Sequence, residues 1–318
     1  MEKILVTGAA GFIAAKVVEK LLKAGQAVVG IDNLNDYYDP ELKKHRLSQL
    51  QHKNFEFLPL DIENKQGIQA LFKKHSFQTV YNLAARAGVR YSLLHPDVYL
   101  STNAQGTLNL LEAMKEKGGK FILASTSSLY AGQKMPFLET LPVNTPISPY
   151  AATKKAAEVM SYTYHQLYGI DVSVVRYFTV YGPAGRPDMS PFIFTEKMLK
   201  DEKLPVFGDG TQARDFTFVD DIAEGTILAS KKLGFEVINL GGGRKPYSLN
   251  QMIQILEEKT GKKAQIQFGQ TAPGDMDVTW ADIQKAKDLL SWEPKVDFVE
   301  GLERTLHWHQ KNLGKFLL

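Results

Sequence analysis

Residues 7–14, Thr7-Gly8-Ala9-Ala10-Gly11-Phe12-Ile13-Ala14, follow an apolar run at 4–6 and open a stretch in which apolar residues recur at helical spacing. Glycine allows a tight turn between strand and helix and lets the backbone approach a pyrophosphate. The free N–H groups at the start of the helix attract the same anion. Alanine is small enough for the third position of the G-x-x-G-x-x-A spacing. This stretch predicts the first strand–turn–helix unit of a dinucleotide-binding fold, the alternative being a plain tight turn.

Short apolar runs alternate with amphipathic stretches from this unit to about residue 178. Strands are predicted at 4–6, 27–31, 55–60, 79–83, 121–124 and 172–176, and helices at 11–23, 39–50, 65–74, 96–117 and 150–168. Strands separated by helices of this length need crossover connections, and hence a parallel sheet. The predicted fold class is α/β, a Rossmann-type doubly wound parallel sheet.

Beyond residue 178 the pattern loosens. Loops rich in glycine and proline are predicted at 182–191 and 203–212, helices at 220–232, 249–260, 282–290 and 299–312, and a strand at 237–240. We therefore expect an NAD-binding domain at 1–178 and a smaller C-terminal α/β substrate-binding domain at 179–318. The strand at 237–240 could return to the first sheet, so that about 220–247 would join the first domain.

Composition excludes several classes of protein. The 318 residues are 44% hydrophobic, and their 38 basic and 35 acidic side chains leave a net charge of only +3, which does not support a nucleic-acid partner. With no cysteine there are no disulfides or thiolate metal sites, and the seven histidines show no metal-binding spacing. No apolar run approaches the roughly 20 residues of a membrane span, and the first residues do not resemble a signal peptide. We expect a soluble, cytoplasmic protein without a metal.

The acid that accompanies the glycine turn indicates the cofactor. Asp32 ends the second predicted strand, about 20 residues after the turn, where a carboxylate binds the hydroxyls of an adenosine ribose and repels a 2′-phosphate. No arginine follows at once to receive such a phosphate, so the pattern favours NAD over NADP. Asp61, after the third strand, is predicted either to bind the adenine or to cap the next helix.

Tyr150 and Lys154 lie four residues apart, on one face of a strongly helical stretch. The fifth predicted strand leads into the hydroxyl-rich residues 125–128, which include Thr126. An ammonium and a positively charged nicotinamide nearby would favour the phenolate of Tyr150. With Thr126 sharing the substrate hydroxyl, Tyr150 is then predicted to remove a proton while carbon gives hydride to NAD. The alternative is an ordinary surface helix.

Other candidate features are interpreted as structural. A second pair of the same spacing, Tyr130 and Lys134, runs into Met135-Pro136 and is not expected to be helical. The basic run 43–46 is expected on a solvated helix face. His307 and His309 are expected at surface or partly buried positions.

With these residues in place, the sequence resembles the extended short-chain dehydrogenase/reductase family over nearly its whole length. Within that family it is most similar to the nucleotide-sugar 4-epimerases that act on UDP-glucuronate. The likeness is carried by residues 32–39 (DNLNDYYD), 87–92 (AGVRYS), 176–183 (RYFTVYGP), 185–189 (GRPDM) and 214–217 (RDFT). The resemblance implies an NAD-dependent, reversible epimerisation at carbon 4 of a UDP-hexuronate, from UDP-glucuronate to UDP-galacturonate, through a transient 4-keto sugar.

The resemblance also implies roles for individual residues. The catalytic positions match Thr126, Tyr150 and Lys154. The NAD contacts match Gly8, Gly11, Phe12, Ile13, Asp32, Asn33, Asn35, Asp61, Ile62, Leu83, Ala84, Ala85 and Asn103, together with Tyr150 and Lys154. Positions near the UDP-sugar match Arg90, Thr179, Arg214 and Asp275, and Arg186 matches a partner for the sugar carboxylate. The sequence departs from the family pattern at Ala14 and Ala15 (usually Gly-Ser), Arg86 (often glutamine) and Ala131 (usually glycine).

The residues after Thr126 separate related activities. Sugar-nucleotide dehydratases carry acidic residues there and UDP-glucuronate decarboxylases a glutamate, whereas this chain has Ser127 and Ser128. These serines are predicted to hydrogen-bond the sugar carboxylate, or only to cap the following loop. A UDP-glucose 4-epimerase and a non-catalytic NAD-binding scaffold remain the alternatives. The resemblance also implies a homodimer, formed by helices near 103–117 and 150–168.

Overall fold

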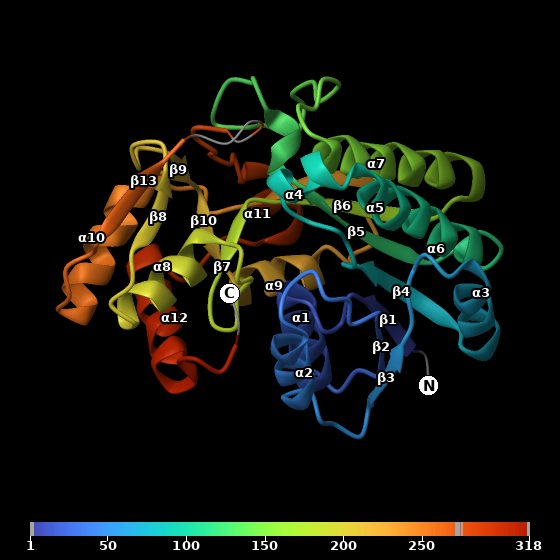
Figure 1. The fold of residues 1–318 in the computed structure, drawn as a ribbon. Helices are drawn as coiled ribbons and strands as arrows, with labels where there is room; N and C mark the ends of the chain where they lie inside the picture. The colour runs from blue at the N-terminus through green and yellow to red at the C-terminus, as the bar shows by residue number, and fades with distance from the viewer. Residues whose placement is uncertain (1–2, 271–273, 275, 317–318) are drawn as a thin grey trace.

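The computed structural model describes residues 3–270, 274 and 276–316, and a seven-stranded sheet in the order β11-β6-β5-β4-β1-β2-β3 runs through its centre (Figure 1). Its strands are β1 (Lys3–Thr7), β2 (Val28–Asp32), β3 (Phe55–Pro59), β4 (Phe77–Asn82), β5 (Lys120–Thr126), β6 (Asp171–Tyr177) and β11 (Phe235–Leu240). All neighbouring strands in it pair in parallel. The chain order reverses at β1, which confirms the doubly wound parallel sheet, and β11 returns to β6 as expected.

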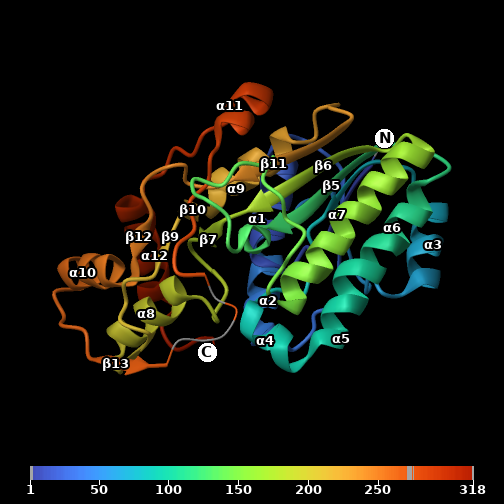
Figure 2. The ribbon, with the colours of Figure 1, turned by 90° about the horizontal axis from the view of Figure 1, so that it is seen from above.

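Helices cover both faces of this sheet, and Figure 2 shows them as two layers. One layer holds α1 (Phe12–Lys23), α2 (Pro40–Ser48), α9 (Val219–Leu228) and α11 (Gln284–Leu290), and the other α3 (Lys65–Lys74), α6 (Thr107–Met114) and α7 (Pro149–Tyr168). Each layer has its own cluster of buried aliphatic and aromatic side chains, with Val17 and Val18 of α1 in the first and Leu110 and Leu111 of α6 in the second. The near-continuous apolar strands follow from burial on both faces.

The C-terminal part lies beside the carboxyl ends of the central strands (Figure 1). It contains β7 (Thr179–Tyr181), α8 (Ser190–Leu199), β8 (Leu204–Phe207), β9 (Ala213–Arg214), β10 (Phe216–Phe218), β12 (Tyr247–Ser248), α10 (Leu249–Thr260), β13 (Ile266–Gly269) and α12 (Phe298–Asn312). The strands form small two-stranded sheets, β7 with β10, β8 with β13 and β9 with β12. A third cluster of buried side chains, all from Tyr181 to Leu302, fills this part.

Three sequence-based expectations for the elements are wrong in detail. The helix predicted at 96–117 is divided into α5 (Pro96–Tyr99), a π-helical turn η1 (Leu100–Gly106) and α6. The loop predicted at 203–212 contains strand β8, in which Pro205 is tolerated because β8 is an edge strand paired only with β13 among the described strands. Helices α4 (Val89–Leu94) and α8 were not predicted, and α8 begins inside the loop expected at 182–191; the short strands β7, β9, β10, β12 and β13 were not predicted either.

The expectation for one histidine is also wrong. His309 is only 1% exposed, and its Nδ1 lies 2.9 Å from Glu196 Oε2 of α8. The face of α12 that carries His309 packs on α8, a contact that helical spacing alone does not define. Within residues 3–270, 274 and 276–316, no helix combines the length and apolar character that crossing a membrane requires.

Candidate active site

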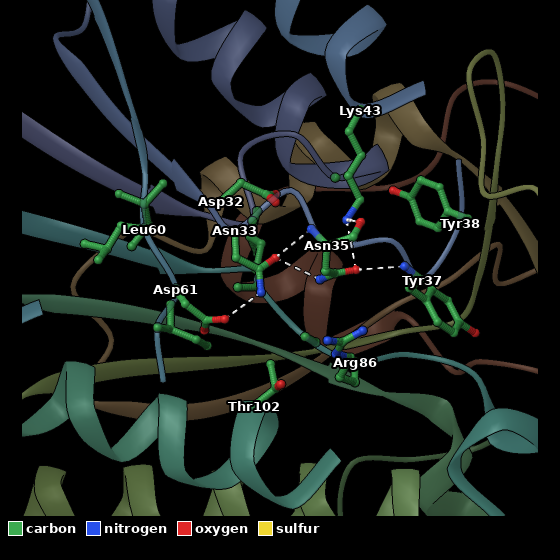
Figure 3. A pocket seen from close by; sticks show the side chains of 17 residues that line it. Asp32, Asn33, Asn35, Tyr37, Tyr38, Lys43, Leu60, Asp61, Arg86 and Thr102 are labelled. Atoms are coloured by element: carbon green, nitrogen blue, oxygen red, sulfur yellow. Dashed lines mark hydrogen bonds between the residues drawn. The ribbon is translucent and has the colours of Figure 1, made fainter. Parts of the chain in front are cut away.

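Two adjoining pockets open at the carboxyl ends of the central strands, where parallel α/β sheets bind their ligands. The first lies between the ends of β1, β2 and β4, and Figure 3 shows the side chains that line it. The second is the larger and extends over β5 and β6 towards the C-terminal part. Gly8 and Gly11 line both, so the glycine turn lies where the pockets meet.

The glycine turn has the shape that a dinucleotide diphosphate needs. Gly8 has a φ of +67°, and a Cβ there would lie 2.8 Å from Ala84 Cα. A Cβ on Gly11 would lie 2.8 Å from Gly8 O. Gly11 is the N-cap of α1 and makes no side-chain capping bond, so the first N–H groups of α1 are available to an anion. These residues fit NAD.

Asp32 holds the turn and the loop after β2 together. Its Oδ2 accepts a hydrogen bond from Ala10 N at 3.1 Å, and its Oδ1 accepts one from Leu34 N at 2.8 Å. The carboxylate borders the first pocket (Figure 3), the position expected for an acid that binds ribose hydroxyls.

Asp61 lies across the same pocket and does not cap α3. Its Oδ1 accepts from Glu63 N at 2.8 Å, and its Oδ2 from Asn33 Nδ2 at 2.6 Å. The N-cap of α3 is Asn64, whose side chain accepts from Gly67 N. The capping alternative is therefore wrong, and the contact with adenine stays a prediction.

The basic run 43–46 on α2, predicted to lie on a solvated face, differs most clearly from its prediction. Lys44 is exposed, but Lys43 and Arg46 are each only 4% exposed. Lys43 Nζ donates to Asn35 O at 2.6 Å and to Asn35 Oδ1 at 3.0 Å beside the first pocket (Figure 3). Burial lowers the pKa of Lys43 to about 8, against the opposing charge of Asp32. The i,i+3 spacing places both cations on one face of α2, but the sequence carries no signal that this face is buried.

Arg86 also lines the first pocket, and the sequence analysis noted it only as a departure from the family. Its backbone is held at both polar atoms, because Arg86 N donates to Asn103 Oδ1 at 2.9 Å and Asn103 Nδ2 donates to Arg86 O at 3.0 Å. Its Nε is buried without a hydrogen-bond partner among the described residues. Asn103 therefore lies behind the pocket wall, and its predicted contact with NAD stays a prediction.

The second pocket collects most of the predicted catalytic and substrate residues. Its lining includes Gly8, Gly11, Phe12, Ile13, Leu83, Ala85, Thr126, Ser127, Ser128, Tyr150, Lys154, Thr179, Arg186 and Arg214. Of the other predicted substrate residues, Arg90 lies outside both linings with its guanidinium 4.0 Å from the centre of the Phe207 ring, and Asp275 lies outside the described residues. Tyr37, Tyr38, Met189, Met276 and Thr279 line the pocket as well and were not predicted.

The start of α7 presents Tyr150 and Lys154 to this pocket. Ser148 caps the helix by accepting from Ala151 N, and Pro149 occupies its first position. Burial raises the pKa of Tyr150, while a hydrogen bond with Thr126 and the charge of Arg186 lower it. Burial lowers the pKa of Lys154 to about 8. The protein thus brings a half-buried phenol, a hydroxyl and a readily deprotonated ammonium together.

Thr126 caps the short 3₁₀ helix η2 (Ser127–Tyr130) by accepting from Ser128 N at 3.1 Å. The cap is therefore Thr126 and not one of the two serines, which both line the pocket. Across the pocket, Arg186 pairs with Asp188, whose Oδ2 lies 2.5 Å from Arg186 Nη2. That pair raises the pKa of Arg186 although burial opposes its charge. Hydroxyls and a fixed guanidinium face one cleft, a set suited to a carboxylate.

A turn for a dinucleotide and a Thr–Tyr–Lys set over a single cleft define an NAD-dependent enzyme of the Rossmann type. The family model described as GDP-mannose 4,6 dehydratase matches residues 5–305. The chain belongs to that family, within the extended short-chain dehydrogenases/reductases, which confirms the resemblance inferred from the sequence.

Relatives within the family narrow the comparison. A UDP-glucuronate 4-epimerase of Thermodesulfobacterium geofontis is 58% identical over 311 residues, covering 97% of this chain and 96% of the relative. The crystal structure of UDP-glucuronic acid 4-epimerase from Bacillus cereus, in complex with UDP-glucuronic acid and NAD, superposes with a TM-score of 0.92 at 40% identity, covering 97% and 99% of the two chains. A UDP-glucose 4-epimerase from Thermotoga maritima, solved with UDP-glucose, gives 0.89 at 36% identity, covering 98% and 99%.

Proposed function

We propose that this protein interconverts UDP-glucuronate and UDP-galacturonate by epimerisation at sugar carbon 4, with NAD as a bound cofactor. The observation that carries the proposal is the single cleft lined by Thr126, Tyr150, Lys154 and Arg186, which is continuous with the glycine turn. The names of the similar proteins from T. geofontis and B. cereus support it.

The cofactor would be held by residues of both pockets. Gly8 and Gly11 face its diphosphate, Asp32 its adenosine ribose, and Lys154 the nicotinamide side of the cleft. When bound, NAD supplies reversible hydride transfer at sugar carbon 4. Tyr150 accepts the proton of the carbon-4 hydroxyl, and Thr126 hydrogen-bonds to the phenol so that oxygen and proton stay aligned. After the 4-keto sugar has turned in the cleft and presents the opposite face of carbon 4 for the returning hydride, Tyr150 gives the proton back to the carbon-4 oxygen.

The carboxylate of the substrate needs separate control. Oxidation at carbon 4 of a glucuronate produces a β-keto acid, which loses carbon dioxide when the carboxylate bond stands perpendicular to the keto plane. Ser127 and Ser128 offer neutral hydroxyls that hydrogen-bond a carboxylate in either orientation of the sugar, and Arg186 faces them across the pocket. Together these groups hold the carboxylate away from the geometry of decarboxylation.

A UDP-glucose 4-epimerase is the second candidate, favoured by the T. maritima likeness. The two are distinguished by incubating the purified protein with UDP-glucuronate and with UDP-glucose and identifying products by NMR. We expect UDP-galacturonate from the first substrate, little UDP-galactose from the second and little UDP-pentose. Preferred turnover of UDP-glucose would support the second candidate. Bound NAD with no turnover of either sugar would instead support a non-catalytic scaffold.

We also propose a homodimer in which α7 packs against its counterpart. Its outer face exposes apolar side chains that a monomer gains nothing from exposing: Val159 is 52%, Tyr162 48% and Leu167 66% exposed. Leu100, in the neighbouring turn η1, is 59% exposed. Sedimentation of the wild type and of Val159→Glu tests this proposal. We expect a dimer that the glutamate converts to monomer, and a monomeric wild type would contradict it.

Two further proposals concern the division into domains and the location in the cell. We propose residues 1–178 together with about 220–247 as the NAD-binding domain and the rest of 179–318 as the substrate domain, because the third buried cluster stays within the second part. Helix α11 is the exception, since its buried side chains pack in the first cluster, on the central sheet. We propose a cytoplasmic location, since the reaction uses NAD and a nucleotide sugar. Fractionation of cells that express the protein tests the location.

A further inference from the structure

Arg46, expected from the sequence on a solvated helix face, is only 4% exposed and lies against the glycine turn. Its Nε and Nη2 donate to Ala184 O at 3.0 and 2.9 Å, and Nη2 also donates to Gly185 O at 2.9 Å. Its Nη1 donates to Ala10 O at 3.2 Å and to the Tyr38 hydroxyl at 2.6 Å. A guanidinium has five N–H donors, and these five bonds use all of them.

The segments that Arg46 joins serve different parts of the active site, the cofactor turn and the substrate pocket. Ala10 lies within the glycine turn that lines both pockets, between Gly8 and Gly11. Ala184 and Gly185 lie 138 and 139 residues further along the chain than Arg46, and they directly precede Arg186 of the substrate pocket. One side chain therefore connects the cofactor turn with the loop that carries the proposed carboxylate partner.

The loop before Arg186 needs such support. Ala184 has a φ of +53°, in the left-handed region that costs any residue with a Cβ, and such conformations persist only where the surroundings hold them. Two of the five Arg46 bonds go to the carbonyl of this residue. A second link holds the other side of Arg186, because the Tyr37 hydroxyl donates to Asp188 Oδ2 at 3.2 Å and Asp188 pairs with Arg186.

The positive charge of Arg46 also bears on cofactor binding. Among the described residues it forms no ion pair with a carboxylate, and its neighbour Lys43 is another cation, whose pKa it helps to lower. A buried positive charge, held by carbonyl and hydroxyl dipoles and by the Tyr38 ring 5.3 Å away, lies directly against the turn proposed to face the cofactor diphosphate. An anion at that turn therefore stabilises the side chain where it is.

We infer that Arg46 is a positioning residue that couples the cofactor turn to the placement of Arg186, so that uronate recognition and cofactor retention depend on each other. The inference rests on the proposed function, in which Arg186 binds the sugar carboxylate. Because coupling between two binding sites is reciprocal, loss of Arg46 weakens both uronate recognition and cofactor retention.

The test compares Arg46→Met with Arg46→Lys, and uses Lys44→Met, an exposed cation of the same helix, as the matched control. We measure KM for UDP-glucuronate, the inhibition constant of UDP-glucose as a competitor, and the fraction of protein that retains NAD. For Arg46→Met we expect KM to rise about ten-fold, the inhibition constant to change less than about three-fold, and NAD retention to fall. Arg46→Lys keeps the charge but not the five-donor fork, so its KM should rise less, and Lys44→Met should match the wild type.

Arg186→Leu and the double variant with Arg46→Met separate this inference from the proposed function. If the coupling holds, the double variant raises KM no more than Arg186→Leu alone. Equal effects of Arg46→Met on uronate and neutral ligand, or additive effects in the double variant, would overturn the coupling while Arg186→Leu remained uronate-selective. An Arg186→Leu variant that weakens both ligands equally would instead refute the assigned role of Arg186, and NAD retention would then still report on Arg46.

Discussion

The two tyrosines that are each followed four residues later by a lysine have opposite fates in the structure. Tyr150 and Lys154 lie in the first turns of α7 and both line the substrate pocket. Tyr130 ends the short helix η2 and is completely buried, whereas Lys134 is exposed beyond it. The same spacing thus brings one pair to a common cleft and separates the other.

The hydroxyl of the buried tyrosine is fully used for structure. Arg176 Nη1 donates to the Tyr130 oxygen at 2.8 Å, and that hydroxyl donates to Asn239 Oδ1 at 2.8 Å. Arg176 in turn pairs with Glu158 of α7, and Asn239 belongs to β11. Tyr130 therefore connects strands of the sheet, whereas Tyr150 has an oxygen available to substrate. A hydroxyl with two protein partners stabilises the fold, and one with a free side can do chemistry.

The largest expected effect is on activity when Tyr150 loses its oxygen. Tyr150→Phe should lower kcat about a thousand-fold, since the proton acceptor is removed while the ring still packs. Bound NAD, measured after denaturation, and the melting temperature should stay at wild-type values. Activity within a few-fold of wild type would show that another group takes the proton.

The lysines provide the second contrast. Lys154→Met should lower kcat about a hundred-fold, because an ammonium near the phenol favours the phenolate, and each pKa unit corresponds to about 1.4 kcal/mol. Lys134→Met, on an exposed side chain of the other pair, should leave kcat unchanged. Steady-state kinetics on UDP-glucuronate compare the two, and similar losses in both would remove the distinction between the pairs.

The pH dependence of kcat tests whether Lys154 must carry its charge. Burial lowers the pKa of Lys154 to about 8, below the value of about 10.4 for a free lysine. The ammonium is therefore present below pH 8 and lost as pH rises through 8, so kcat should fall by up to ten-fold per pH unit on that limb. Lys154→Arg, which stays charged, should lack the limb if it remains active. A wild-type rate that is flat to pH 10 would contradict the assignment.

The smallest effect on activity, and the largest on stability, is expected at the buried tyrosine. Tyr130→Phe leaves Arg176 Nη1 and Asn239 Oδ1 without their partner, which should lower the free energy of unfolding by about 2 kcal/mol. The rate of epimerisation should stay within about two-fold. Urea unfolding measures the first, with Tyr91→Phe, 36% exposed, as the control. An unchanged unfolding midpoint would mean that this hydroxyl does not stabilise the fold.

Much of the cofactor half was predictable because its signals are local. The glycine turn, Asp32 and the helical spacing of Tyr150 and Lys154 lie within short stretches whose backbone conformation depends on their own residues. The sequence also predicted correctly that Tyr150 and Lys154 share a helix and that Tyr130 and Lys134 do not, since Pro136 prevents a helix after Tyr130. The predictions were wrong where pairing with a distant segment overrode a weak local pattern, as in strand β8, which pairs with β13.

The sequence by itself determined the alternation of the central strands with most of their helices, the dinucleotide turn and the shared helix face of Tyr150 and Lys154, because turn chemistry and helical periodicity are properties of neighbouring residues. Only the tertiary structure decided that Lys43 and Arg46 are buried, that Asn103 supports Arg86 from behind the pocket, and that Arg186 and the serines after β5 line one pocket. The placement of Arg46, for example, depends on Ala184, which lies 138 residues further along the chain. No local spacing encodes which carbonyls will surround a buried guanidinium, because that follows from how the completed layers pack.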